Sequence, residues 1–346
     1  MVAISGRTRP FIYIFLSAAL FGISPPASKV LVADVSPVAL AGLLYMGAFL
    51  GLMVMRLVQG TGEKEAALKR SELPYLAGSI LSGGVIAPIL LMTGIASVTG
   101  MASSLLLNLE GVATALIAFL MFGEPVGKRT WTAVVLMTAA GAMLTFNAEN
   151  GEASGLGVAL IVLAMALWGL DNNLTSRIAG TGARRIAMLK GLVAGTTSLS
   201  IALLLGQAPP VNAEMLAALL LGSLSYGASL VLFIFALGEL GPARTGAFFA
   251  LGPFIGALVS IPLLGEVPGL MVLPAGALMA LGTYVLLKER HDHLHWHPRI
   301  VHDHVHDHSA DHAHQHINGM VGPHGHEHVH EAVLHEHEHS RGDHHP

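Results

Sequence analysis

Histidine has the clearest chemical pattern of any residue type in this chain. All 20 histidines of the 346-residue sequence lie in its last 56 residues, from His291 to His345, and thirteen His-x-His steps separate neighbours by one residue. In an extended chain, side chains two residues apart project to the same side, so a flexible segment can gather three or four imidazoles around one ion. Imidazole binds Zn, Ni, Co and Cu, and the absence of cysteine removes thiolate ligands.

We therefore predict that a C-terminal tail, residues 289–346, binds several divalent transition-metal ions (Zn, Ni, Co or Cu), and that the protein requires no other cofactor. Residues 291–346 contain nine Asp/Glu and no apolar period, so we expect the tail to be disordered. Two His-Glu-x-x-His matches, at His326 and His335, arise by chance in such a repetitive tract, and we expect no enzyme. The candidate metal ligands are His291, His293, His295, His297, His302, His304, His306, His308, His312, His314, His316, His324, His326, His328, His330, His335, His337 and His339.

Three roles for the tail stay open at this point. It could collect a metal that the rest of the chain exports, or it could sense metal for an exporter of an organic metabolite, amino acid or drug. It could also respond to pH without any metal, because histidine changes its charge between about pH 5 and 8.

The rest of the chain is apolar and free of histidine. Hydrophobic residues make up 53% of the whole sequence and charged residues only 12%, which is typical of a membrane protein. Apolar runs of about 20 residues are long enough to cross the hydrocarbon core as helices. We predict an all-α membrane protein with ten spans, at residues 11–32, 36–58, 73–94, 97–122, 128–147, 154–176, 186–206, 213–237, 242–264 and 267–287.

Lys and Arg alternate between the loops in a way that predicts the orientation. Basic residues precede the first span and follow spans 2, 4, 6, 8 and 10, whereas loops such as 147–153 and 206–212 contain none. Basic residues stay on the cytoplasmic side of short loops, so both termini, including residues 1–10 and the tail, should be cytoplasmic. Lys29 alone departs from the pattern, and its long stem could reach the interface.

The body repeats itself. Ala19-Leu-Phe-Gly-Ile-Ser matches Ala166-Leu-Trp-Gly-Leu-Asp, and Phe122-Gly-Glu-Pro matches Leu264-Gly-Glu-Val-Pro. Each half, residues 11–147 and 154–288, contains five predicted spans. Because five is odd, the second half must be inverted relative to the first, as in secondary transporters that bind substrate between their halves.

Two carboxylates fall deep within predicted spans. Glu110 lies in the middle of span 4, and Asp171 lies in the inner half of span 6. An ionisable group at the bilayer centre costs about 2.5–3.5 kcal/mol on insertion scales, so each calls for a function such as proton coupling or binding of a cationic substrate. A purely structural role, with each bound to backbone groups at helix breaks, is the alternative. The neighbouring amides Asn108, Asn172 and Asn173 join them as candidates for the transport cavity.

Helix breaks are predicted where prolines and glycines interrupt the spans. Pro25 and Pro26 remove two backbone donors from span 1, and Gly83, Gly84 and Pro88 loosen span 3. By the repeat offset, Asn172-Asn173 occupy the place of Pro25-Pro26, where their amides could satisfy freed backbone in span 6. Such breaks fit a substrate site, but a packing kink without a ligand is an equal alternative for the prolines.

Further positions carry weaker signals. Glu124 and Glu266 end spans 4 and 9 on opposite predicted faces, where capping or gating contacts are favoured. Trp168 faces either the core or the cavity, and the core is the favoured interpretation. Close helix approach is predicted at three Gly-x-x-x-Gly pairs, namely Gly47/Gly51, Gly191/Gly195 and Gly252/Gly256.

These motifs together resemble a known family. Leu120-Met-Phe-Gly-Glu-Pro and Ala139-Ala-Gly-Ala-Met in the first half, and Leu251-Gly-Pro and Leu264-Gly-Glu in the second, resemble the EamA domain of the drug/metabolite transporter superfamily. The resemblance covers about residues 11–288 and leaves out the tail. It implies a ten-helix transporter with two EamA repeats in the bacterial inner membrane, in a superfamily dominated by exporters. Fold does not fix the substrate. The expected partners are the lipid bilayer and a small-molecule or metal-ion substrate, a homodimer stays open, and no nucleic acid is expected.

Overall fold

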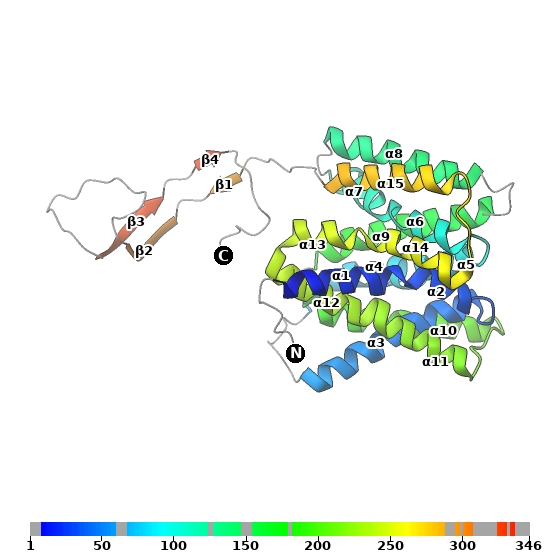
Figure 1. The fold of residues 1–346 in the computed structure, drawn as a ribbon. Helices are drawn as coiled ribbons and strands as arrows, with labels where there is room; N and C mark the ends of the chain where they lie inside the picture. The colour runs from blue at the N-terminus through cyan, green and yellow to red at the C-terminus, as the bar shows by residue number, and fades with distance from the viewer. Residues whose placement is uncertain are drawn as a thin grey trace. The chain divides into compact units, whose positions relative to one another are not determined.

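The computed structural model describes residues 8–59, 68–123, 127–146, 154–178 and 182–287 of the body, and residues 295–297, 300–306, 324–330 and 333–335 of the tail. The chain divides into two compact units, Met1–Glu289 and Arg290–Pro346. The first unit is a helical bundle (Figure 1). Its first half comprises α1 (Arg9–Gly22), α2 (Ser24–Leu31), α3 (Pro37–Gln59), η1 (Arg70–Glu72), α4 (Leu73–Ser79), η2 (Ile80–Ile86), α5 (Ala87–Ala96), α6 (Gly100–Leu106), α7 (Leu109–Phe122) and α8 (Lys128–Phe146).

The second half repeats this order with fewer interruptions. It comprises α9 (Gly155–Ser176), α10 (Ala183–Leu204), α11 (Ala213–Gly222), η4 (Ser223–Ala228), α12 (Ser229–Leu240), α13 (Pro242–Phe249), α14 (Gly252–Leu264) and α15 (Val272–Leu287). Short helices that follow one another directly, such as α1 and α2 or α6 and α7, together form one predicted span.

Eight helical stretches within the described residues are long and apolar enough to cross a membrane. They correspond to eight of the ten predicted spans, so the chain is a multi-pass membrane protein. The other two predicted spans, 128–147 and 267–287, correspond to α8, with 19 residues, and to the shorter apolar helix α15, with 16 residues. These two helices lie side by side (Figure 1).

The predicted breaks of spans 1 and 3 are confirmed. One residue, Ile23, separates α1 from α2, and the first turn of α2 then accommodates Pro25 and Pro26, where their missing N–H groups cost nothing. Gly83 and Gly84 lie inside the π-helix η2, and Pro88 lies in the first turn of α5. The corresponding span of the second half contains a second π-helix, η4. Short π-helical segments of this kind occur frequently at functional sites.

The expected interruption of span 6 is wrong. Helix α9 runs without a break through Asn172 and Asn173 to Ser176. Asparagine keeps its backbone N–H, so unlike proline it does not remove a helical hydrogen bond. The side-chain amides bind groups on α7 instead, as described below.

Contacts between the halves follow an exchange pattern. Helix α1 packs against α12 and α14, and α9 packs against α5 and α7. Helix α3 packs against α10, α6 against α14, and α8 against α15. If each span is replaced by its counterpart in the other half, the α1–α12 contact becomes the α9–α5 contact and the α1–α14 contact becomes the α9–α7 contact. The other three contacts are unchanged by this exchange.

Glycines allow these helices to approach at backbone distance. A Cβ atom added at Gly47 would lie 2.1 Å from the carbonyl oxygen of Leu219, and one at Gly222 would lie 2.0 Å from that of Leu44. All six members of the predicted Gly-x-x-x-Gly pairs have an atom of another helix within 3.1 Å of an added Cβ. Small residues at helix interfaces act in this way because apolar lipid gives helices little hydrophobic reason to associate.

The tail has regular structure where none was expected. Four strands are described, β1 (His295–His297), β2 (Ile300–His306), β3 (His324–His330) and β4 (Val333–His335). Strand β1 pairs with β4 and β2 pairs with β3, both antiparallel. The His-x-His alternation has the two-residue period of a strand, and Ile300, Val301, Val305 and Val329 are β-branched, so the sequence favours extended backbone.

Gly222→Ala should destabilise the bundle by about 1–3 kcal/mol, because the new methyl group would meet backbone that cannot rotate away. Thermal unfolding of the purified protein in detergent measures the change. Gly238→Ala on α12 is the matched control, since no atom lies within 4 Å of an added Cβ there. The control should be neutral or gain up to about 1 kcal/mol from higher helix propensity. Equal melting of the two variants would contradict the close approach of α3 and α11.

Candidate functional site

Asp171 is buried in α9 and its carboxylate is well supplied with donors. Oδ1 accepts hydrogen bonds from Ser79 Oγ at 2.5 Å and from Thr175 Oγ1 at 3.0 Å, and Oδ2 forms an ion pair with Lys190 of α10. Only 6% of Asp171 is exposed. Three helices therefore meet at one charge-neutralised carboxylate, which is the arrangement that a buried charge requires.

The π-helix η2 brings its backbone to the same place. Tyr45 Oη donates to the carbonyl oxygen of Gly83 at 2.7 Å, and Trp168 Nε1 donates to the same oxygen at 3.0 Å. A Cβ at position 83 would lie 2.0 Å from Asp171 Oδ2, so only glycine permits this approach. Trp168 is buried, as the favoured core interpretation predicts, but its indole N–H also faces this polar group.

Glu110 has a different environment from Asp171. It lies in the first turn of α7 and is only partly buried, and Asn172 Nδ2 donates to its Oε1 at 2.8 Å. Within the described part of the chain, Glu110 has no ion-pair partner and no other hydrogen-bond donor to its carboxylate. The side chain of Asn172 is exposed and also donates to Thr114 Oγ1 at 3.2 Å. One carboxylate oxygen of Glu110 is thus left available.

Two stacked tyrosines lie beside these carboxylates. The rings of Tyr45 and Tyr226 have centroids 5.9 Å apart and are inclined by 29°. Glu110 is close enough to both tyrosines for an electrostatic interaction, and Asp171 is close enough to Tyr45. Ser24 Oγ donates to Tyr226 Oη at 3.0 Å, just before Pro25 and Pro26. We call Tyr45, Glu110, Trp168, Asp171 and Tyr226 the central cluster.

The repeat relates the two sides of this cluster. In the matched segments, Phe21 takes the place of Trp168 and Ser24 takes the place of Asp171. Phe21 packs edge-on against Tyr226 in η4, with ring centroids 6.1 Å apart, while Trp168 binds Gly83 in η2. The first span of each half therefore packs against the π-helix of the other half, α1 against η4 and α9 against η2. Of the matching residues Ser24 and Asp171, only Asp171 carries a charge.

The remaining predicted amides bind backbone. Asn173 Nδ2 donates to the carbonyl oxygens of Thr114 at 3.0 Å and Gly169 at 2.8 Å, which ties α9 to α7. Asn108 Nδ2 donates to the Leu105 carbonyl oxygen at 3.0 Å, where α6 gives way to α7. Asn108 and Asn173 are buried, and Asn108 Oδ1 also accepts a hydrogen bond from Thr283 Oγ1 at 3.4 Å.

Glu266 and Lys29 hold the junction between α5 and α6. The carboxylate of Glu266 accepts the backbone N–H groups of Gly100 at 2.6 Å and Met101 at 2.8 Å. Lys29 Nζ donates to the carbonyl oxygens of Ile95 at 2.8 Å and Ala96 at 2.9 Å. An acid thus caps the start of α6 and a base caps the end of α5, as helix dipoles favour.

The structure does not describe Glu124, and it describes only some of the histidines predicted as metal ligands. Glu124 lies outside the described residues. Of the candidate tail ligands, His291, His293, His308, His312, His314, His316, His337 and His339 also lie outside them, and the others lie on strands for which the backbone is described. Among the residues described, no three His, Asp or Glu side chains form a group that could hold a metal ion.

Sequence analysis overlooked several members of the site. Lys190 counted only as a basic residue near a loop, Gly83 was predicted only as a helix break, and Ser79 and Thr175 were not predicted at all. Tyr45 could have been found, because it is a polar aromatic residue in the middle of span 2 and one of only five tyrosines. No signal in the sequence pairs Lys190 with Asp171.

Comparison with known proteins gives a consistent result. The model of the EamA-like transporter family matches residues 8–146 and 155–288, one match for each half. An uncharacterized transporter of Methanothermobacter thermautotrophicus is 29% identical over 294 residues, covering 80% of this chain and 85% of that protein. A protein of known crystal structure is 17% identical with a TM-score of 0.55, covers 82% of this chain and 96% of its own, and shares the fold. The two family matches span most of the body, and the chain belongs to the EamA-like transporter family.

Proposed function

We propose that this chain is a secondary-active exporter with ten membrane spans in two inverted repeats, residues 11–147 and 154–288. In this proposal the membrane is the bacterial inner membrane and both termini are cytoplasmic, because Lys and Arg are concentrated in alternate loops. The exchange pattern of helix contacts supports the repeat. Transporters of this type bind substrate near the midplane, where the halves meet.

The observation that carries the transport mechanism is the contrast between Glu110 and Asp171. Asp171 is neutralised by Lys190 and hydrogen-bonded twice more, so it is occupied within the protein. Glu110 receives a single amide donor from an exposed Asn172 and lies within electrostatic range of Tyr45 and Tyr226. Glu110 is therefore the group that exchanges a proton for a cationic substrate, and the Asp171–Lys190 pair holds α9 against α10 and α4.

The tail links the transporter to a divalent transition metal such as Ni, Co or Zn. Its β2–β3 register aligns His302 with His328, His304 with His326 and His306 with His324. Positions two apart along a strand share a face, so these six histidine positions belong to one face of the hairpin. That register supports metal binding by the tail.

A second candidate function is export of an organic metabolite, amino acid or drug, with a tail that only senses or buffers metal. The stacked rings of Tyr45 and Tyr226 favour it. Aromatic faces beside a carboxylate suit an organic ammonium group, which gains cation–π attraction that a hydrated metal ion would gain less readily. In this function Glu110 keeps the same role.

Glu110→Gln should reduce proton-coupled transport by about tenfold or more, because the amide cannot exchange a proton, while the melting temperature stays near that of the unmodified protein. Pyranine-loaded proteoliposomes report proton movement when Zn²⁺, Ni²⁺, Co²⁺ or organic cations are added. If this variant transports any of these compounds as fast as the unmodified protein does, Glu110 has only a structural role.

Asp171→Asn should destabilise the protein by up to about 3 kcal/mol, because it leaves the partly buried Lys190 ammonium without its partner. Thermal unfolding in detergent measures this change. The double variant Asp171→Asn with Lys190→Met removes both charges and should recover most of the stability. If the single variant is as stable as the unmodified chain, the ion pair does not hold these helices together.

Glu266→Leu should cost about 1–3 kcal/mol, because it leaves two backbone N–H groups of α6 without acceptors. Glu214→Gln is the control, since Glu214 makes no ion pair or hydrogen bond through its side chain with the described residues, and its effect should stay within about 0.5 kcal/mol. Both are read from melting curves. An equal, small effect of the two changes would show that the α5–α6 junction does not depend on this carboxylate.

Deletion of residues 291–346 should abolish binding of several Zn²⁺ or Ni²⁺ ions per chain, measured by calorimetry on the purified protein. Binding by the full chain should weaken as the pH falls below about 6, because protonated imidazole cannot bind a metal. Cellular Ni, Co and Zn content should also change on deletion. Unchanged content both in the deletion strain and in a strain lacking the whole protein would remove the metal from the transport function.

A further inference from the structure

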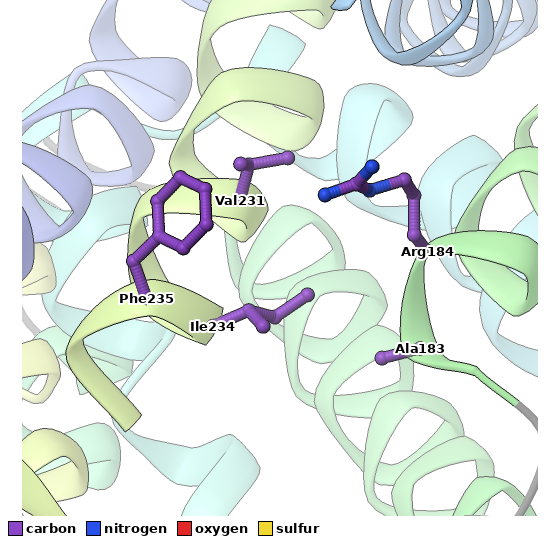
Figure 2. Close-up of a pocket in the computed structure, with 5 residues that line it drawn as sticks. All are labelled: Ala183, Arg184, Val231, Ile234 and Phe235. Atoms are coloured by element: carbon purple, nitrogen blue, oxygen red, sulfur yellow. The ribbon is translucent and has the colours of Figure 1, made fainter. Parts of the chain in front are cut away.

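A small pocket lies between the start of α10 and α12, away from the central cluster. Ala183 and Arg184 line it from α10, and Val231, Ile234 and Phe235 line it from α12. Figure 2 shows the guanidinium group of Arg184 extending from α10 toward the apolar side chains of α12. The pocket thus has one cationic group on its α10 side and apolar side chains on its α12 side.

The charge of Arg184 has no counter-charge within the described part of the protein. Arg184 makes no ion pair or hydrogen bond through its side chain there, whereas the partly buried Lys190 on the same helix pairs with Asp171. The first turn of α10 contains no acidic residue, and a second arginine, Arg185, follows directly. The α10 side of the pocket is therefore positive and complementary to an anion.

The α12 side of the pocket continues onto the apolar surface of the bundle. Val231 is buried, Ile234 is partly buried and Phe235 is 42% exposed. The ring of Phe235 also contacts Tyr13 of α1, with centroids 5.9 Å apart. A ligand that fits the pocket therefore needs an anionic group for Arg184 and a hydrocarbon part for α12.

We propose that this pocket binds an anionic phospholipid, with its phosphate on Arg184 and an acyl chain along Ile234 and Phe235. Arginine suits this role because its guanidinium donates two parallel hydrogen bonds to a phosphate. The assignment rests on the proposed orientation, in which Arg184 lies at the cytoplasmic boundary. Basic pockets between helices on that side bind lipid headgroups.

Retention of lipid by the purified full chain tests the proposal. The protein is exchanged into detergent containing phosphatidylglycerol or phosphatidylcholine, and bound lipid is measured by native mass spectrometry. The unmodified chain should retain phosphatidylglycerol in preference to phosphatidylcholine. Arg184→Gln should lower phosphatidylglycerol retention about tenfold, which corresponds to 1.4 kcal/mol. Arg244→Gln, which removes an exposed arginine on the same predicted face but outside the pocket, should leave retention unchanged.

Two further measurements test the apolar side of the pocket and distinguish a lipid phosphate from free phosphate. Phe235→Ala leaves the charge in place and should weaken lipid retention severalfold, which also covers the case that Arg184→Gln fails to fold. Inorganic phosphate at millimolar concentration should not displace the lipid. Equal retention by Arg184→Gln and the unmodified chain, or displacement by free phosphate, would overturn the proposal. The measurement does not involve transport. A chain that transports substrate without retaining lipid would therefore contradict the lipid proposal and leave the proposed transport function intact.

Discussion

The structure depends on one constraint, which is that a charge inside a membrane protein must find its partners within the protein. Asp171 meets this constraint with contributions from α4, α9 and α10. Because no single helix could supply those groups, the three helices must be held at fixed heights relative to one another. The ion pair therefore sets the register of the helices around it, whether or not it adds net stability.

Glycine makes that arrangement sterically feasible. The carboxylate of Asp171 can reach η2 only because position 83 has no side chain, and α3 can cross α11 only because Gly47 and Gly222 leave their backbones in contact. The π-helix contributes in a second way, since its altered hydrogen bonding presents the Gly83 carbonyl to Tyr45 and Trp168 together. Polar contacts and close helix packing thus depend on the same few positions.

The sequence predicted those features that depend on local composition. Eight apolar runs coincide with helical stretches long and apolar enough to cross a membrane, Pro25-Pro26 and Gly83-Gly84 marked real interruptions, and the Gly-x-x-x-Gly pairs marked real helix crossings. Pairing between distant helices could not be predicted, because nothing local connects Lys190 to Asp171 or Glu266 to Gly100. The repeat misled in one respect. It equated Asn172-Asn173 with two prolines by position, although asparagine retains the N–H that keeps α9 continuous.

The difference between the two halves bears on how such a transporter could work. Symmetric contacts would give the protein two equivalent states, whereas Ser24 and Asp171 occupy matching positions with different charge. Ser24 loses only one neutral hydrogen bond, to the hydroxyl of Tyr226, when it separates from η4. Asp171 cannot separate from Lys190 without exposing a charge to a low dielectric, which costs far more. Motion should therefore concentrate at the contact between α2 and η4, while α9, α10 and α4 remain fixed relative to one another. In that arrangement, Asn172 on α9 positions Glu110, the group that we propose exchanges the proton, while movement between α2 and η4 opens and closes the path to it.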